Sequence, residues 1–418
     1  MRPADPGTAD RPGCPVRHDG TVALHGPQFT EDPAGLYRRM RAEHGPVVPI
    51  ELEGGVPAWF VGDYREINEV CGDPRVFARA PHRWRHWDRV PEGWSLLPYV
   101  AAQPSMGFTE GDEYRTRVEI FADVLGGYDQ FELQAHCEQH ADRLIDAFAT
   151  GGEAELIAQY ADALPLYVLA QVCGVAPEQT EGLVHDMTGS IGGGDSTAAL
   201  DRIVRRMHSM VAAKRENPGP DLTSRMLRHQ DRVTDEQIAY DMLITMTAGH
   251  LTVAHWIGNT MRLMLTDERF AIGLAGGRRS VGQALNEVLW EETPTQNYIG
   301  RYATQDVQLG GRLIRAGDML VLGLAAGNTD PRIRPGSYAD SVGNNAFLSF
   351  GIGDRGCPHP APEVAETIAR AGIEVLLDRL PDIRLAVPPG ELRWIPSVWM
   401  RGLTALPVRF SPSYVVGA

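Results

Sequence analysis

The sequence predicts a mainly α-helical protein with small β-sheets, which is an α+β fold. The strongest evidence is a long apolar stretch at residues 234–265, which has Asp235 and Glu236 in its first turn. Acidic side chains are favoured at that end of a helix by the helix dipole. At ~1.5 Å per residue the helix would span roughly 45 Å. Because apolar residues cover most of its circumference, we expect a buried central helix.

Two further observations support this fold class. Residues 131–172 are continuously helix-like, which adds a second long helical segment. Residues 47–52 and 58–61 are apolar segments separated by Gly54-Gly55, which predicts a β-hairpin. Residues 1–30 are polar and proline-rich, and we expect a loosely ordered N-terminal arm there. Shorter helices are expected at residues 33–41, 63–71, 202–215 and 222–228.

Composition and charge exclude several classes of protein. A chain of 418 residues with 43% hydrophobic residues can bury a large core. Its formal net charge of −15 makes nucleic acid an unexpected partner. The five cysteines have the spacing of neither a zinc site nor a short disulfide framework, which fits a reducing cytoplasm. No run of about 18 apolar residues occurs, so we expect no membrane span.

A glycine-rich loop at residues 350–358 delivers a single cysteine, Cys357, to the start of a helix. Apolar residues spaced by four, three and four positions follow it, and they define one helical face: Val364, Ile368, Ala371 and Val375. A thiolate is stabilised by a nearby metal and by a helix N-terminus, and soft sulfur suits iron. Cys357 is therefore a candidate iron ligand. The alternative is a buried cysteine in an ordinary strand-to-helix turn.

The pattern Phe350-Gly-x-Gly-x-Arg-x-Cys resembles the heme loop of soluble bacterial cytochrome P450s of the actinobacterial type. The resemblance covers about residues 30–410 and implies the cytochrome P450 fold, with residues 31–418 as a single domain. It also implies heme b as the cofactor and Cys357 as the axial ligand of its iron. Phe350, Gly351 and Arg355 are implied as further cofactor-binding residues.

Within the central helix, residues 247–252 resemble the oxygen-binding groove of the same family. The resemblance implies catalytic roles for Ala248, Gly249, His250 and Thr252. Leu251 stands where the family carries an acid, and leucine cannot carry a proton. Water, His250 or the substrate would then have to supply protons to the reaction.

Arginines are expected to bind the heme propionates, because a guanidinium forms strong charge-assisted hydrogen bonds to carboxylates. Residues 110–117 resemble the family's propionate-binding stretch, with Glu113 where histidine is common. Arg117 is the better candidate there, and Arg115 could equally lie on a solvated helix face. Arg301 resembles a propionate-binding arginine on a strand, and Arg355 would supply another contact.

The family's E-x-x-R motif is altered. Glu287 is present, but Trp290 replaces the first arginine. Val342 stands where the family has a second arginine, in the loop before the cysteine. A tryptophan in this place resembles a minority branch of actinobacterial P450s. Because a lone buried carboxylate is costly, we expect Glu287 to find backbone donors, water or another cation.

Residues 80–108 form a long connection rich in tryptophan. Aromatic residues in such a loop can line an apolar substrate pocket, or they can pack beneath the fold. We expect substrate contact. The candidate substrate-contacting residues are Trp84, Trp87, Trp94, Leu251, Tyr298, Ile299 and Val398.

Two prolines, Pro358 and Pro360, follow the cysteine closely, and proline has no N–H to donate to sulfur. Fewer donors leave a more electron-rich thiolate, because such hydrogen bonds tune the metal. We expect a lower reduction potential than in a typical P450, and an ordinary value in a redox titration would contradict this. Both prolines could also simply preset the first helical turn.

The resemblance implies a cytoplasmic monooxygenase or oxidative-coupling enzyme of secondary metabolism. It would use O2, take electrons from ferredoxin and ferredoxin reductase, and act on a small-molecule or small peptide substrate. Two alternatives remain open. One is a peroxide-dependent or substrate-assisted oxidase, which would tolerate Leu251. The other is a heme-binding partner or signalling protein with little turnover.

Overall fold

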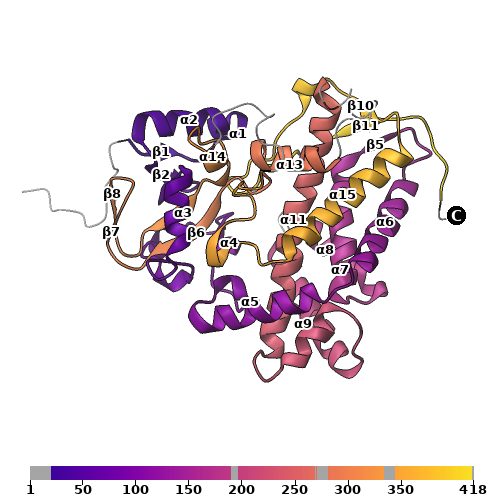
Figure 1. Cartoon of the computed structure of the whole chain (residues 1–418), viewed down its shortest axis with the longest axis horizontal. Coiled ribbons are helices and arrows are strands. Elements are labelled where there is room, and N and C mark those ends of the chain that lie inside the picture. Colours follow the sequence, from indigo (N-terminus) through magenta and orange to yellow (C-terminus); the bar gives the residue numbers. More distant parts are fainter. Residues whose placement is uncertain (1–19, 190–195, 269, 271–280, 334–343, 417–418) are drawn as a thin grey trace, which may run out of the picture.

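The computed structural model describes residues 20–189, 196–268, 270, 281–333 and 344–416. Most of the helices gather on the right in Figure 1, and the largest sheet lies on the left. This mainly α-helical architecture with small sheets confirms the predicted fold class. The longer helices are α2 (Pro33–His44), α3 (Tyr64–Gly72), α5 (Gly111–Gly126), α6 (Gln130–Asp146), α7 (Ala163–Cys173), α8 (Pro177–Gly189), α9 (Ser196–Glu216), α11 (Asp235–Thr266), α13 (Val281–Glu291) and α15 (Ala361–Arg379). The shorter helices are α1 (Pro27–Glu31), α4 (Leu97–Val100), α10 (Leu222–Met226) and α14 (Leu324–Asn328).

The predicted central helix is confirmed as α11. A capping box fixes its start, because the Thr234 side chain accepts from the N–H of Gln237 at 3.2 Å and the Gln237 side chain accepts from the N–H of Thr234 at 2.9 Å. Helices α7, α9, α13 and α15 all pack against α11. It is therefore the element around which the helical part is assembled.

The continuous helix predicted for residues 131–172 is wrong. Helix α6 ends at Asp146, the short strand β5 (Glu153–Glu155) follows, and a π-helical turn precedes α7. Gly152 has φ of 75°, a conformation that favours glycine and stops the helix before β5. Pairing of β5 with β11 (Pro407–Arg409) then holds the chain away from a helical path.

The predicted hairpin is confirmed as β2 (Val47–Leu52) and β3 (Val56–Val61), which pair antiparallel. It belongs to a six-stranded sheet in the order β1, β2, β3, β9, β6, β4. The other strands of this sheet are β1 (Val22–Ala23), β9 (Met319–Leu322), β6 (Tyr298–Ala303) and β4 (Phe77–Ala78). Val48 and Phe60 pack in one hydrophobic cluster and Val47 and Val61 in another, so both faces of the sheet are covered.

The N-terminal arm needs a correction within its described part. Residues 20–30 contain strand β1, which pairs parallel with β2, and most of helix α1. Leu24 and Phe29 are buried in the core, so these residues are held in place by apolar packing.

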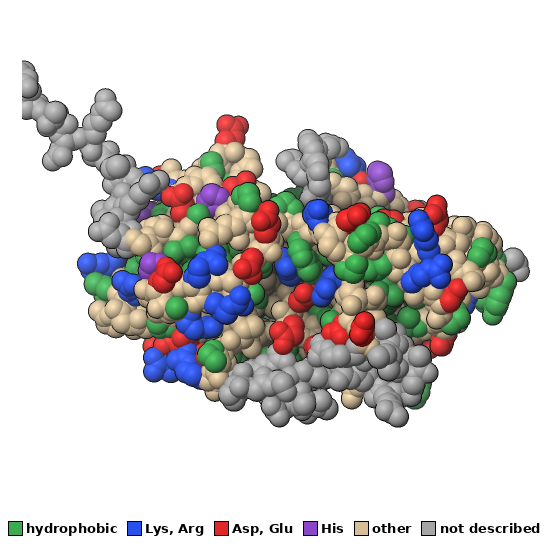
Figure 2. Space-filling view, turned by 90° about the horizontal axis from the view of Figure 1, so that it is seen from above, with side chains coloured by type: hydrophobic (Ala, Val, Ile, Leu, Met, Phe, Trp, Pro, Cys, Tyr) green, Lys and Arg blue, Asp and Glu red, His purple; other side chains and the backbone are tan. Residues whose placement is uncertain are grey.

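No helix in the described ranges combines the length and the apolar character that crossing a membrane would require. Acidic and basic side chains are interspersed over the face seen in Figure 2.

Candidate functional site

The loop that carries Cys357 is folded back tightly before α15. The N–H of Cys357 donates to the carbonyl of Phe350 at 2.7 Å, which closes the loop. Gly351 and Gly353 have φ of 70° and 69°, which favours glycine at both positions. A Cβ atom on Gly353 would lie 2.7 Å from the carbonyl oxygen of Cys71. Glycine at 351 and 353 is thus required by the shape of the loop, and α15 begins four residues after the cysteine.

Cys357 is accessible to solvent. Its thiol is nevertheless desolvated by the protein that surrounds it. Desolvation by this protein raises the pKa of the Cys357 thiol to about 12, and the charge of Glu363 acts in the same direction. Accessibility together with desolvation is expected of a thiol that faces an internal open space. In the described part of the chain, no hydrogen bond contributes to the pKa of this thiol. A bound cation would favour the thiolate form.

One face of α11 is accessible in the middle of the molecule. Ala248 is exposed, and Ile244, Leu251 and Thr252 are partly exposed, although other helices surround α11. Ile244, Leu251 and Thr252 are each three or four positions from Ala248, so all four lie on one side of the helix. The cysteine loop packs against the same helix, because the rings of Phe350 and Trp256 are 5.8 Å apart. Open space therefore lies along this face.

The catalytic candidates divide between two sides of α11. Ala248 and Thr252 lie on the accessible side, where the Thr252 hydroxyl donates to the Ala248 carbonyl at 2.7 Å. Gly249 packs against α7, since a Cβ there would lie 2.9 Å from a methyl carbon of Leu169. His250 is 1% exposed and lies on the opposite side of the helix. Burial lowers the pKa of His250 to about 4, although a hydrogen bond to the backbone of Asp162 acts in the opposite direction.

Two predicted arginines, Arg301 on β6 and Arg355 in the cysteine loop, belong to one cluster with a third, Arg79. Residue 79 follows β4, whose Ala78 pairs with Tyr302, so Arg79 and Arg301 lie opposite each other on neighbouring strands. Among the described residues, none of the three arginines forms an ion pair with a carboxylate. Buried nitrogen atoms without a partner are Nε of Arg79, Nε of Arg301 and Nη1 of Arg355.

The electrostatics of this cluster indicate a missing anion. The pKa of Arg355 is lowered to about 10, chiefly by desolvation, with the charges of Arg301 and Arg79 acting in the same direction and those of Tyr114 and Tyr298 opposing it. Burial alone would raise the pKa of Tyr298, but the three arginines around this tyrosine lower it instead. Buried cations that repel one another are stabilised by a ligand with negative charge. The cluster therefore fits a ligand that carries carboxylates.

Arg117 and Arg115 lie outside this cluster. The Arg117 guanidinium binds both carboxylate oxygens of Asp241 on α11, at 2.6 and 2.9 Å, and both side chains are fully buried. It also donates to the carbonyls of Pro104 and Gln237. Arg115 is exposed and pairs with Asp112. The structure thus gives Arg117 a protein carboxylate in place of the propionate that the sequence predicts.

Trp290 connects α13 to the segment before the cysteine loop. Its indole N–H donates to the carbonyl of Asn344 at 3.1 Å. Its ring is nearly perpendicular to that of Phe347, with the ring centroids 5.8 Å apart. The side chain is 1% exposed, so the indole fills the position that the resemblance assigns to an arginine. Glu287 is also buried. Val342 lies outside the described residues.

The three tryptophans of residues 80–108 pack beneath the fold, contrary to the expected substrate contact. Trp84 lies 4.9 Å from Trp87 and 5.9 Å from Trp94 between ring centroids, and all three pack in the cluster on one face of the large sheet. The Trp87 and Trp94 N–H groups donate to backbone carbonyls. Apolar area is buried more completely against the sheet than in a loop over a pocket.

Of the other substrate candidates, Ile299 is fully buried, whereas Leu251, Tyr298 and Val398 are partly exposed. Tyr298 belongs to an aromatic group with Trp399 and Tyr99, which the sequence did not single out. The ring centroid of Trp399 lies 5.8 Å from that of Tyr298 and 4.2 Å from that of Tyr99. Arg79 was also missed. The signal for Arg79 was its place after a short strand, but that signal requires knowing that this strand pairs with β6.

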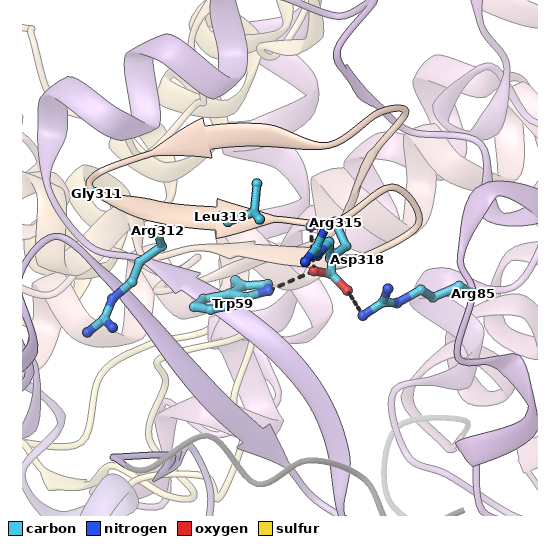
Figure 3. A pocket seen from close by; sticks show the side chains of 7 residues that line it. All are labelled: Trp59, Arg85, Gly311, Arg312, Leu313, Arg315 and Asp318. Carbon is cyan, nitrogen blue, oxygen red and sulfur yellow. Dashed lines mark hydrogen bonds and ion pairs between the residues drawn. The ribbon is translucent and has the colours of Figure 1, made fainter.

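A separate cavity of about 350 Å³ lies beside the large sheet, and none of the candidate site residues described above lines it. Figure 3 shows Asp318 between Trp59 and Arg85, with Arg312 and Arg315 nearby. Asp318 accepts from the indole N–H of Trp59 at 3.0 Å and pairs with Arg85 at 2.7 Å. Its carboxylate is already satisfied by protein.

Comparison with known proteins gives consistent matches along the chain. Cytochrome P450 monooxygenase PikC of Streptomyces venezuelae is 30% identical over 98% of this chain and 97% of its own length. A myxobacterial cytochrome P450 solved with myristic acid has a TM-score of 0.82, at 25% identity over 93% of this chain and 98% of its own. The cytochrome P450 CxnD, for C–S bond formation in chuangxinmycin biosynthesis, has a TM-score of 0.79, at 25% identity over 96% of this chain and 99% of its own. No model in a scan of protein families matches the chain.

Proposed function

Because the chain belongs to the cytochrome P450 family and is a heme b oxidoreductase, we propose that it is a monooxygenase or oxidative-coupling enzyme of secondary metabolism. It acts on a small-molecule substrate, with electrons from ferredoxin and ferredoxin reductase. The relatives support this, because PikC is named a monooxygenase and CxnD forms a C–S bond in a biosynthetic pathway. The single observation that carries the proposal is the accessible Cys357 thiol in a glycine-rich loop against α11.

The residues of the site fit heme, which supplies the oxygen-activating redox chemistry when bound. Cys357 would hold the iron, since a thiolate suits iron and a lone cysteine offers one such ligand. Arg301 and Arg355 would hold the two propionates, because both have buried donor atoms without a protein acceptor. Phe350 and Gly351 would shape the loop beneath the ring. The four cysteines that the structure describes are free thiols, as we propose for a cytoplasmic protein.

The residues that could supply protons distinguish this chain from the rest of the family. Leu251 lies on the accessible side of α11 where the family's acid is expected, and His250 points to the opposite side. Thr252 donates its hydroxyl hydrogen to Ala248 and would have to rotate to hold a proton or water near the reacting atoms. Water or the substrate must therefore carry the proton. This observation favours a second candidate function, a peroxide-dependent or substrate-assisted oxidase, because peroxide reduces the need for proton delivery.

Turnover with two oxidant systems tests the proposal. The purified enzyme is supplied either with O2, ferredoxin, ferredoxin reductase and NADPH, or with hydrogen peroxide alone. We expect ferredoxin-supported turnover that rises at least tenfold in Leu251→Asp, because a positioned acid contributes about 10²-fold or more to proton transfer. Turnover with peroxide only, unchanged by Leu251→Asp, would contradict the ferredoxin-dependent function and support the second candidate.

A further inference from the structure

Arg79 is held rigidly although no carboxylate holds it. Its side chain is 4% exposed, and Nη1 donates to the carbonyls of Ile299 and Gly300, both at 2.7 Å. Nη2 donates to the carbonyl of Tyr99 at 3.2 Å. These bonds to neutral carbonyls fix the guanidinium plane and leave it without an anionic side-chain partner among the described residues.

The donors that remain on Arg79 match a carboxylate. A guanidinium has five N–H donors, and the three bonds to carbonyls leave the Nε–H and one hydrogen on Nη2. The Nε atom is buried and has no protein partner. Nε and one Nη nitrogen form the fork that binds a carboxylate through two parallel hydrogen bonds. Arg79 therefore presents a prepared edge for one acceptor with two oxygens.

The number of cations in the cluster exceeds what heme alone requires. Arg79, Arg301 and Arg355 are close enough for their charges to act on one another. Heme b has two propionates, and Arg301 and Arg355 suffice to pair with them. Arg79 is then the third cation, and a third carboxylate would complete the site.

The surroundings of Arg79 are aromatic. The rings of Phe108 and Tyr298 each lie 5.0 Å from its guanidinium carbon. Tyr298 and Tyr99 both contact Trp399, and these three rings are partly exposed. A cation beside an accessible aromatic wall suits a ligand that is apolar along its body and anionic at one end.

We propose that Arg79 anchors a carboxylate within the site, and that this carboxylate belongs to an apolar or aromatic substrate. The inference rests on the proposed function and gives it a substrate class. A heme propionate offers the same chemistry, so the test measures substrate binding and heme retention separately.

The first measurement is calorimetric binding of matched ligand pairs to the wild-type holoenzyme. The pairs are 4-phenylbutyrate with 4-phenylbutyramide, indole-3-propionate with its amide, and dodecanoate with dodecanamide. We expect at least one acid to bind about tenfold or more tightly than its amide, as a charge-assisted pair implies. This result needs no variant. If no acid is preferred over its amide, the substrate assignment is overturned.

The second measurement assigns the preference to Arg79. Arg79→Met should bring the acid-to-amide ratio close to one, and Arg79→Lys should keep part of it because the charge remains. Arg75→Met is the matched control, since Arg75 is 92% exposed on the same segment and should keep the wild-type ratio. An unchanged ratio in a folded Arg79→Met protein would overturn the proposal.

Heme transfer to excess apomyoglobin distinguishes the two carboxylate sources. If Arg79 binds the substrate, Arg79→Met should release heme within about twofold of the wild-type rate. Heme loss faster by tenfold or more, with an unchanged acid-to-amide ratio, would assign Arg79 to a propionate and overturn the substrate assignment. A wild-type protein that holds no heme would instead contradict the proposed function.

Discussion

Single residues in this chain take partners that their sequence neighbourhood does not reveal. Arg117 lies in a stretch that resembles a propionate-binding motif, yet it binds Asp241 on another helix. Arg79 has no motif around it, yet it joins the cluster with Arg301. Both outcomes depend on which side chains the fold brings together over more than a hundred residues of sequence. The shape of the Cys357 loop could be predicted because its sequence carries local signals, namely its glycines and the helical pattern that follows.

The Arg117–Asp241 pair predicts a large effect of one substitution. Asp241→Asn removes a buried charge and leaves the buried Arg117 guanidinium with only the half-exposed Glu113 as an ion partner, which costs about 3–5 kcal/mol of unfolding free energy. Chemical denaturation of the holoenzyme measures this. Asp112→Asn is the control, because Asp112 pairs with Arg115 on the surface, where an ion pair contributes little. Equal stabilities of the two variants would contradict the importance of the buried pair.

Whole elements were predicted best where one physical signal dominates. The apolar residues of α11 and the acidic residues in its first turn were sufficient, and the hairpin of β2 and β3 followed from its Gly-Gly turn. The break between α6 and α7 was missed because it depends on pairing of β5 with β11, a partner about 250 residues away in the chain. The tryptophans of residues 80–108 were misplaced for a related reason, since the sheet beneath them is assembled from distant strands.

The cysteine loop is the element whose shape should be least tolerant of change. Gly353→Ala would place a Cβ 2.7 Å from the Cys71 carbonyl at a positive φ, so we expect a loss of about 1–3 kcal/mol of unfolding free energy together with weaker heme retention. Gly390→Ala is a suitable control, because a Cβ at that exposed glycine meets no atom within 4 Å. Thermal denaturation and heme content of the two purified variants provide the comparison. A Gly353→Ala protein as stable and as heme-replete as Gly390→Ala would show that the loop does not need its glycine.

At the scale of the whole molecule, the helical part and the sheet each supply a portion of the site. Helix α11 provides the accessible face with Thr252, β6 and the end of β4 provide Arg301 and Arg79, and the loop before α15 provides Cys357. The family membership follows from the whole chain, whereas the departures at Leu251 and Trp290 are local. The fold can therefore be predicted from motifs, but the proton source and the substrate depend on side-chain placement.

The central claim is that Cys357 ligates heme iron in spite of these departures. The most direct measurement is the absorption spectrum of the reduced protein under carbon monoxide, for wild type and for Cys357→Ala. We predict a strongly red-shifted Soret band in the wild type, because a thiolate donates electron density to the iron, and its loss in Cys357→Ala. A wild-type protein that binds no heme, or whose Soret band is unshifted and unchanged by Cys357→Ala, would contradict the account.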